Sequence, residues 1–273
     1  MPIGIFDSGL GGLTIYDAID RRLPHTELIY WGDNKRAPYG TKTSEEIYQF
    51  TSRSICELWQ RGCQLVVLAC NTASAVTLKR LQEEFVPPNR RVLGVFVPTI
   101  ESITERTWGD NSPPKEVSVQ RLALFATPAT VASRAFQREL SFRAIGVDVE
   151  SQACAGLVDA IEDGDLKLAA TLAKRHVKSL LGRMSTPDVA VLGCTHYPIV
   201  FKAFQEALGP EVRVISQPAL VADSLIDYLN RHDWIHLGNK NNSFFTTADP
   251  VAVSSKAKLF LQKPLEFQTA DWM

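Results

Sequence analysis

The chain of 273 residues is 45% hydrophobic and 22% charged, which is typical of a globular protein with one large core or two modest ones. A formal net charge of -1 gives no overall basic field of the kind that draws proteins onto nucleic acid, so no nucleic-acid partner is expected. No apolar run approaches membrane-spanning length and no apolar leader opens the chain, so we expect a cytoplasmic protein without a membrane partner.

Strand-like apolar runs alternate with amphipathic helical stretches along the chain. The capping-box pattern Thr43-Ser44-Glu45-Glu46 predicts a helix from Glu45 to Arg61, and an apolar stripe from Leu166 to Leu180 predicts another that ends near Gly182. His176, beside that stripe, is predicted to pack on the helix face rather than to bind a ligand. The predicted strands are Ile3 to Phe6, Leu28 to Trp31, Leu65 to Ala69, Val92 to Val97, Leu122 to Ala126, Val189 to Leu192 and Val212 to Ile215. Such alternation predicts parallel sheets with crossover helices.

The two halves of the chain echo each other. Ile-Gly-Ile-Phe-Asp7-Ser8-Gly resembles Leu-Ala-Leu-Phe-Ala-Thr127-Pro-Ala-Thr130, and the turn at Cys70 resembles the turn at Cys194. Residues 108–118 contain glycine, asparagine and two prolines without periodicity, which indicates an irregular surface connection just inside a second domain. We therefore expect an α/β fold made of two similar units.

Two cysteines occupy matching positions, Cys70 in Leu-Ala-Cys-Asn-Thr-Ala and Cys194 in Leu-Gly-Cys-Thr-His-Tyr-Pro. Each follows an apolar run and opens a polar turn, which is where open α/β sheets present reactive side chains to ligands. A thiol at the start of a helix has its pKa lowered from about 8.5 by the helix dipole, so we expect a reactive thiolate fraction near neutral pH.

The other cysteines are predicted to be structural. An odd count of five, without the short spacings of a secreted scaffold, indicates reduced thiols. Cys56, Cys63 and Cys70 recur every seven residues, but no C-x-x-C pair or nearby histidine completes a tetrahedral zinc site. No metal is therefore expected.

The remaining polar turns each have a functional and a structural interpretation. Asp7-Ser8-Gly9-Leu10-Gly11-Gly12 lies between a strand and a helix, and its glycines can let N–H groups approach a small carboxylate or phosphate. It matches neither a phosphate-binding loop nor a dinucleotide fingerprint. Asp7 is equally consistent with a helix cap, and the polar residues that follow the two cysteines can cap their helices. The turn from Gly32 to Gly40 can be a plain surface loop.

Two thiols at two strand ends fit three kinds of chemistry. A redox pair would form a disulfide, and a Cys-His hydrolase built on Cys194 and His196 would need one nucleophile and an oxyanion hole. A general base and a general acid on opposite faces of one carbon would invert a stereocentre. The residues by themselves leave all three open.

Four turns carry a resemblance to a known family: Asp7-Ser8-Gly, Arg36-Ala-Pro38-Tyr39-Gly40, Ala-Cys70-Asn71-Thr72-Ala-Ser-Ala and Gly-Cys194-Thr195-His196-Tyr-Pro. In this order and spacing they resemble the signature turns of the aspartate/glutamate racemase superfamily, and of its glutamate racemases in particular. The resemblance runs from Ile3 to Pro198 and more loosely through Phe244 to Pro250. It implies cofactor-free interconversion of L- and D-glutamate, which supplies D-glutamate for bacterial peptidoglycan.

The resemblance also implies roles for individual residues. Cys70 would act first on D-glutamate and Cys194 on L-glutamate, with Asp7 assisting the first thiol and His196 the second. Glu162, eight residues after Cys154, stands where the family often has an acidic residue near the histidine; the alternative is a solvated charge at a helix end. The substrate-binding set would be Asp7, Ser8, Tyr39, Gly40, Asn71, Thr72, Thr127, Thr130, Thr195 and His196, whose donors suit two carboxylates.

The architecture implied is two pseudo-symmetric Rossmann-like α/β/α domains with parallel sheets and the active site in the cleft between them. The first would contain residues 1–98 and 210–273, the second residues 99–209, and the protein would be a homodimer without a cofactor. Ser216-Gln217-Pro218 departs from the small glycine-containing turn that the family would place there. The alternatives are a racemase of aspartate or another acidic amino acid, a Cys-His hydrolase, and a binding protein without catalysis.

Overall fold

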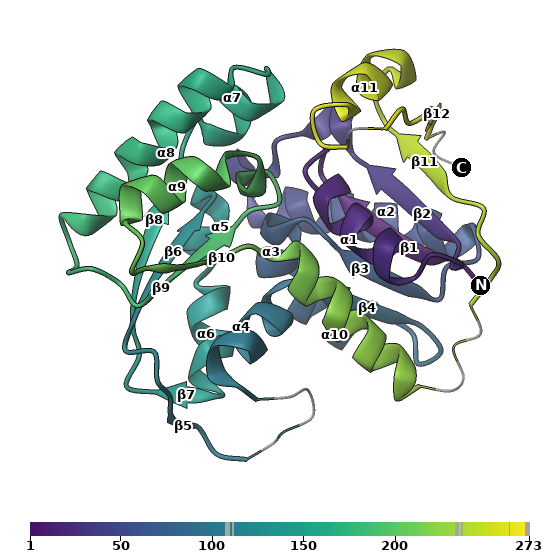
Figure 1. Cartoon of the computed structure of the whole chain (residues 1–273). Helices are drawn as coiled ribbons and strands as arrows, with labels where there is room; N and C mark the ends of the chain where they lie inside the picture. Colours follow the sequence, from purple (N-terminus) through teal and green to yellow (C-terminus); the bar gives the residue numbers. More distant parts are fainter. Residues whose placement is uncertain (107–109, 111, 233–234, 236, 262, 271–273) are drawn as a thin grey trace.

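The computed structural model describes residues 1–106, 110, 112–232, 235, 237–261 and 263–270. Within them the chain forms two main parallel sheets, each flanked by helices, in two domains that lie side by side (Figure 1). This confirms the predicted α/β class. Most of the connection predicted at 108–118 is described and carries a short strand, but residues 108, 109 and 111 lie outside the described part. No helix in the described ranges is long and apolar enough to cross a bilayer.

The first sheet has six parallel strands in the order β12-β11-β2-β1-β3-β4. Its central strands are apolar and fully buried because helices cover both faces, as a parallel sheet requires. The strands are β1 (Ile3–Asp7), β2 (Leu28–Gly32), β3 (Leu65–Leu68), β4 (Arg91–Gly94), β11 (Ser243–Thr246) and β12 (Phe267–Thr269). The helices around it are α1 (Leu13–Arg22), α2 (Ser44–Gln60), α3 (Asn71–Glu84), α10 (Pro218–Asn230) and α11 (Pro250–Ala257), with short 3-10 turns η1 (Asn34–Arg36) and η2 (Tyr39–Thr41).

The second sheet has four parallel strands in the order β10-β9-β6-β8. They are β6 (Arg121–Ala126), β8 (Asp148–Ala153), β9 (Val189–Gly193) and β10 (Arg213–Ile215), and a separate two-stranded ribbon pairs β5 (Lys115–Glu116) with β7 (Ala144–Ile145). The helices of this half are α4 (Phe96–Thr104), α5 (Pro128–Ser133), α6 (Ala135–Ser141), α7 (Leu157–Glu162), α8 (Leu166–Leu181) and α9 (Phe201–Leu208), with the 3-10 turn η3 (Tyr197–Val200).

The two sheets repeat one topology. The order β4-β3-β1-β2 in the first corresponds to β10-β9-β6-β8 in the second, so that β1 is equivalent to β6 and β3 to β9. The echo in the sequence therefore reflects structure: Asp7 and Thr127 follow equivalent strands, and so do Cys70 and Cys194. In each sheet these turns lie at the carboxyl ends of strands where the strand order reverses, which is where open α/β sheets bind ligands.

Two predicted boundaries differ from the structure. The strand at 213–215 was placed in the first domain, but it pairs with β9 because that strand has an open edge on the side away from β6. The chain returns to the first domain only with α10, which packs along α1 (Figure 1). The apolar run predicted as a strand through Val97 ends at Gly94, and α4 begins at Phe96.

The predicted helices are confirmed. Thr43 and Glu46 form both bonds of the capping box that opens α2. His176 is buried on α8, and its ring lies 3.1 Å from the backbone oxygen of Ala155. Its role is to pack and bond within the second domain, as predicted.

Candidate active site

Cys70 lies at the start of α3, directly after β3. Its thiol donates to the Ser8 hydroxyl at 3.4 Å and accepts from the Ala73 amide at 3.5 Å, so it caps the helix. The residue is only 5% exposed. Burial, followed by the nearby Asp7 carboxyl, raises the pKa of the Cys70 thiol to about 12. The expectation of a lowered pKa is wrong for Cys70, because burial outweighs the helix-start hydrogen bond.

Asp7 ends β1 and is completely buried. One carboxyl oxygen, Oδ2, accepts from the Gly9 amide at 2.9 Å, whereas Oδ1 has no hydrogen-bond partner among the described residues. Burial raises the pKa of Asp7. A Cβ at Gly12 would lie 2.5 Å from Cβ of Asp7, so glycine is needed for α1 to begin so close to this carboxyl group.

The second cysteine is part of a chain of three side chains. Sγ of Cys194, at the end of β9, lies 3.7 Å from Nδ1 of His196, and Nε2 of His196 lies 2.8 Å from Oε1 of Glu162 at the end of α7. Burial alone would lower the pKa of His196, but the bonds to Cys194 and Glu162 outweigh it and raise that pKa well above its usual value. A protonated His196 can donate to both partners at once.

The structure places Glu162 inside the site. Burial opposes its charge, but the hydrogen bond from His196 lowers the pKa of Glu162 below its usual value, and its side chain is only 22% exposed. Its Oε1 would be 2.9 Å from a Cβ at Gly9, so it also lies against the turn that follows Asp7. The alternative interpretation as a solvated helix-end charge is therefore wrong.

The glycine turn after β1 lies in direct contact with the second domain. A Cβ at Gly11 would overlap both the His196 ring and the Thr195 hydroxyl, so the turn contacts the second domain directly. The Thr14 hydroxyl donates to the backbone oxygen of Thr195 at 3.2 Å. The backbone amide of Gly9 donates its hydrogen bond to Asp7. The glycines of this turn thus permit close approach of the Cys194 turn.

Three hydroxyl groups meet where α3 and α5 begin. Oγ1 of Thr72 lies 2.9 Å from Oγ1 of Thr127, which lies 2.9 Å from Oγ1 of Thr130, and the third side of this triangle is 3.3 Å. All three threonines are buried. A Cβ at Gly40 would lie 2.9 Å from Cβ of Thr127, so the predicted residue Gly40 borders this cluster as well.

Tyr39 does not offer its hydroxyl to the site in this structure. It is buried, and the hydroxyl donates to Oδ2 of Asp33 at 2.6 Å. Asp33 also accepts from Arg36 and from the Thr247 hydroxyl. Neither Asp33 nor Thr14 was among the predicted site residues.

Gln217 is another residue absent from the predicted set. It is buried, and it accepts from Nδ2 of Asn71 at 2.7 Å. The sequence offered one signal for it, since Ser216-Gln217-Pro218 stands where a small glycine-containing turn was expected.

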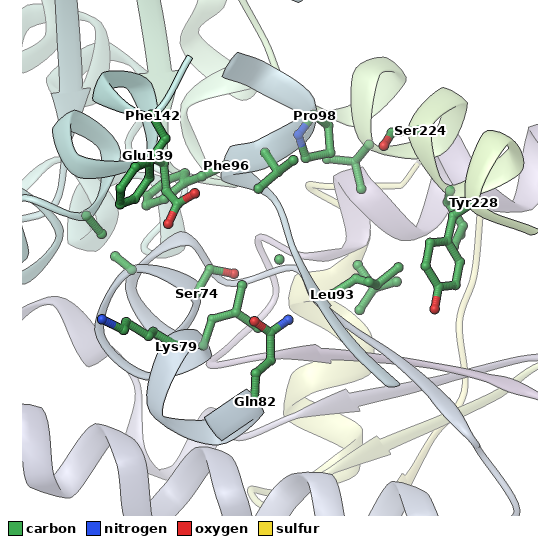
Figure 2. Close-up of a pocket in the computed structure, with 18 of the residues that line it drawn as sticks. Ser74, Lys79, Gln82, Leu93, Phe96, Pro98, Glu139, Phe142, Ser224 and Tyr228 are labelled. Atoms are coloured by element: carbon green, nitrogen blue, oxygen red, sulfur yellow. The ribbon is translucent and has the colours of Figure 1, made fainter. Parts of the chain in front are cut away.

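A large cavity in the described part of the chain lies elsewhere. It has a volume of about 430 Å³, and side chains from α3, α4, α6 and α10 surround it (Figure 2). Leu93, Phe96 and Tyr228 supply part of its apolar wall, and Lys79 and Glu139 bring charge to it. None of the predicted site residues lines it. Both site cysteines are instead enclosed, with 5% and 6% of their surfaces exposed.

All five cysteines are free. Among the described residues, no group of three or more His, Cys, Asp or Glu side chains is arranged to hold a metal ion. Charge on Cys194 adds a smaller contribution, after burial and Asp7, to the raised pKa of Cys70, so the two site thiols interact electrostatically.

Comparison with known proteins identifies the family. The sequence profile described as Asp/Glu/Hydantoin racemase matches residues 3–225. The chain belongs to this family. The glutamate racemase of Ruegeria pomeroyi is 60% identical over 270 residues, which are 99% of this chain and 100% of that protein.

Solved structures agree over the whole length. The structure of a glutamate racemase isoform from Bacillus anthracis covers 98% of this chain and 97% of its own, with a TM-score of 0.84 and 30% identity. That of the Francisella tularensis glutamate racemase, in complex with D-glutamate, covers 99% and 97%, with a TM-score of 0.84 and 27% identity. The fold of these glutamate racemases is therefore the fold of this chain.

Proposed function

We propose that this protein is a glutamate racemase, an isomerase that interconverts L- and D-glutamate and supplies D-glutamate for peptidoglycan. The observation that carries the proposal is the pair of thiols at equivalent strand ends of two pseudo-symmetric domains, near enough for the charge of Cys194 to act on the Cys70 thiol. Full-length relatives that are 60% identical and carry this name favour glutamate over aspartate as the substrate.

The proposed reaction is a transfer of protons at one carbon. The thiolate of one cysteine removes the α-proton of glutamate, and the thiol of the other donates a proton to the opposite face, so that the configuration inverts. Each turnover in one direction leaves the first sulfur protonated and the second ionised, which is the state needed for the reverse direction. Cys70 would act as the base toward D-glutamate and Cys194 toward L-glutamate.

The groups around each thiol suit this task. Near Cys70, the unpartnered oxygen of Asp7 can accept from the substrate ammonium group, whose positive charge would favour ionisation of the thiol. Beside Cys194, His196 holds a proton that Glu162 stabilises. The hydroxyls of Ser8, Thr72, Thr127, Thr130 and Thr195 would bind the carboxylates, with negative charge building on the α-carboxylate as the proton leaves.

Substrate entry would require the domains to move. Both thiols are enclosed, and the turns that hold Gly11 and Thr72 contact the opposite domain. Opening would admit glutamate, and closure would exclude water while the carbanion exists.

A substrate survey tests the proposal. Purified reduced protein is incubated separately with L-glutamate, D-glutamate, L-aspartate and other amino acids, and optical rotation is followed. The proposal predicts racemisation of both glutamate enantiomers and far slower change with aspartate. Faster aspartate turnover would assign the protein to the aspartate branch, and an acyl-enzyme on Cys194 that does not depend on Cys70 would indicate a hydrolase.

The assembly and location are also proposals. We propose a cytoplasmic homodimer, in keeping with the expectation from the family. Sedimentation equilibrium of the full chain tests the dimer: a single species of about 30 kDa, the mass of one chain, would contradict it.

A further inference from the structure

Gln217 lies where the two chain segments that connect the domains meet. It directly precedes α10, in the segment that returns the chain from β10 to the first domain, and Val95 precedes α4, in the segment that leaves it. Nε2 of Gln217 donates to the Val95 backbone oxygen at 3.3 Å and to Oγ1 of Thr99 at 3.1 Å. Oε1 accepts from Nδ2 of Asn71 at 2.7 Å. All four residues are buried.

These contacts allow only one orientation of the Gln217 amide. The Val95 backbone oxygen can only accept, and the Thr99 hydroxyl donates its own proton to that same oxygen at 3.0 Å, so toward Gln217 both atoms are acceptors. The NH₂ group of Gln217 must therefore face them, since the reversed amide would set its oxygen against two other oxygens. Oε1 of Gln217 then faces Asn71, and Asn71 must donate to it from its own NH₂ group.

The carbonyl oxygen of Asn71 is consequently turned away from Gln217. This oxygen is buried and has no hydrogen-bond partner among the described residues, and the same holds for Oδ1 of Asp7. Asn71 follows Cys70 directly, and Asp7 influences the protonation of the same thiol. One unsatisfied acceptor thus belongs to the residue after Cys70 and the other to the carboxyl group that acts on that thiol, and both call for a ligand that donates hydrogen bonds, which fits an ammonium group and excludes a carboxylate.

We propose that Gln217 is a positioning residue: it locks Asn71 so that the Asn71 carbonyl oxygen accepts a hydrogen bond from the α-ammonium group of the substrate. The inference rests on glutamate being the substrate. Without Gln217, the Asn71 amide is free to turn and to present its NH₂ group to the cation. Binding would then lose one acceptor and gain a like-signed dipole, while the carboxylate-binding hydroxyls stay in place.

The test compares two ligands that differ in the amino group. Glutamate and glutarate share both carboxylates, but glutarate has no ammonium group. Dissociation constants are measured by calorimetry for the wild-type protein, for Gln217→Met and for Gln217→Ala, with glutamate at its racemic equilibrium. The variants are expected to bind glutamate about tenfold more weakly while glutarate binding changes little.

Two controls separate positioning from general loss of structure. Gln205 is a matched glutamine whose Nε2 donates to the backbone oxygens of Gly209 and Val212, outside the site. Gln205→Met should therefore leave the ratio of glutamate affinity to glutarate affinity unchanged. In an Asn71→Ala background, Gln217→Met should have no further effect on the preference, because the group that it positions is gone.

The outcomes are distinguishable. Equal weakening of both ligands, or an unchanged preference in both Gln217 variants, would overturn the positioning role while the racemase proposal stands. Failure of the wild-type protein to bind glutamate would remove the proposed function and this inference with it. Circular dichroism of each variant shows which of the two substitutions preserves the fold, and that variant decides the result.

Discussion

Each site cysteine has a different kind of ionisable group near it. A buried carboxyl group, Asp7, lies near Cys70, and an imidazole, His196, lies beside Cys194. The first thiol is held neutral, because burial and Asp7 both disfavour its charge. The ammonium group of the substrate would favour ionisation of Cys70. Beside Cys194, the protein itself supplies the positive charge, on His196.

Replacing either thiol tests the roles of the two sulfurs. Cys70→Ala and Cys194→Ala should each reduce racemisation of both enantiomers by about 100-fold or more, because each removes a group that must carry a proton in every turnover. Cys56→Ala, at a half-buried position on α2, is the matched control and should keep wild-type kcat. Full turnover by Cys70→Ala would refute the two-base mechanism.

The pair of His196 and Glu162 predicts a change in pH dependence. Glu162 raises the pKa of His196, so Glu162→Gln should lower that pKa and move the basic limb of the kcat/KM profile to lower pH, by about one unit or more. The shift should be identical with L- and D-glutamate, because the equilibrium constant of a racemisation is one. A basic limb that stays in place would show that His196 does not need its proton for catalysis.

At the scale of elements, strand positions were predicted most accurately where the strand is uniformly buried. The strands β1, β2, β3, β6 and β9 are short apolar runs buried on both faces, and their position in the chain followed from that pattern alone. β8 was missed because Asp-Val-Glu-Ser-Gln-Ala is polar and the strand lies at the edge of its sheet. The run from Val92 fits strand and helix equally well, and only packing assigns its second half to α4.

The site was predictable in part for a similar reason. Motifs within one turn, such as those at Cys70 and Cys194, show their chemistry in the sequence. The bonds of Gln217 do not, because its partners lie 118 to 146 residues away and only the fold brings them together. The occupied hydroxyl of Tyr39 is likewise a consequence of where Asp33 falls after β2.

The glycine turn between β1 and α1 gives a prediction at the same scale. Gly11→Ala should raise KM about tenfold or more and destabilise the protein by about 1–3 kcal/mol, because the new methyl group overlaps His196 and Thr195. Gly182→Ala is the control: the nearest atom to its new Cβ would be 3.5 Å away, and φ is -74°. Thermal denaturation and steady-state kinetics measure both effects. Wild-type KM in Gly11→Ala would contradict the close contact between the domains.

At the scale of the whole molecule, the residues of the proposed site come from both domains. The first supplies Cys70 and Asp7, the second supplies Cys194, and the threonine hydroxyls of both meet between them. Chemistry on a carbanion benefits from this enclosure, but exchange of substrate then depends on opening.

Enclosure predicts the reactivity of the thiols. Iodoacetamide should modify Cys70 and Cys194 more slowly than the half-buried Cys56, and saturating glutamate should slow modification of the two site cysteines by about tenfold or more by favouring the closed form. Mass spectrometry of peptides over time gives the three rates. Protection of Cys56 to the same extent would point to a general effect on stability.

Racemisation in heavy water tests the central claim most directly. When either pure enantiomer of glutamate is supplied to the reduced protein in D₂O, the account predicts that the opposite enantiomer formed in the first turnovers carries one deuterium at the α-carbon, because the proton it receives comes from a thiol in exchange with solvent. An inverted product that retains the original hydrogen, or no inversion at all, would contradict proton transfer by two opposed cysteines.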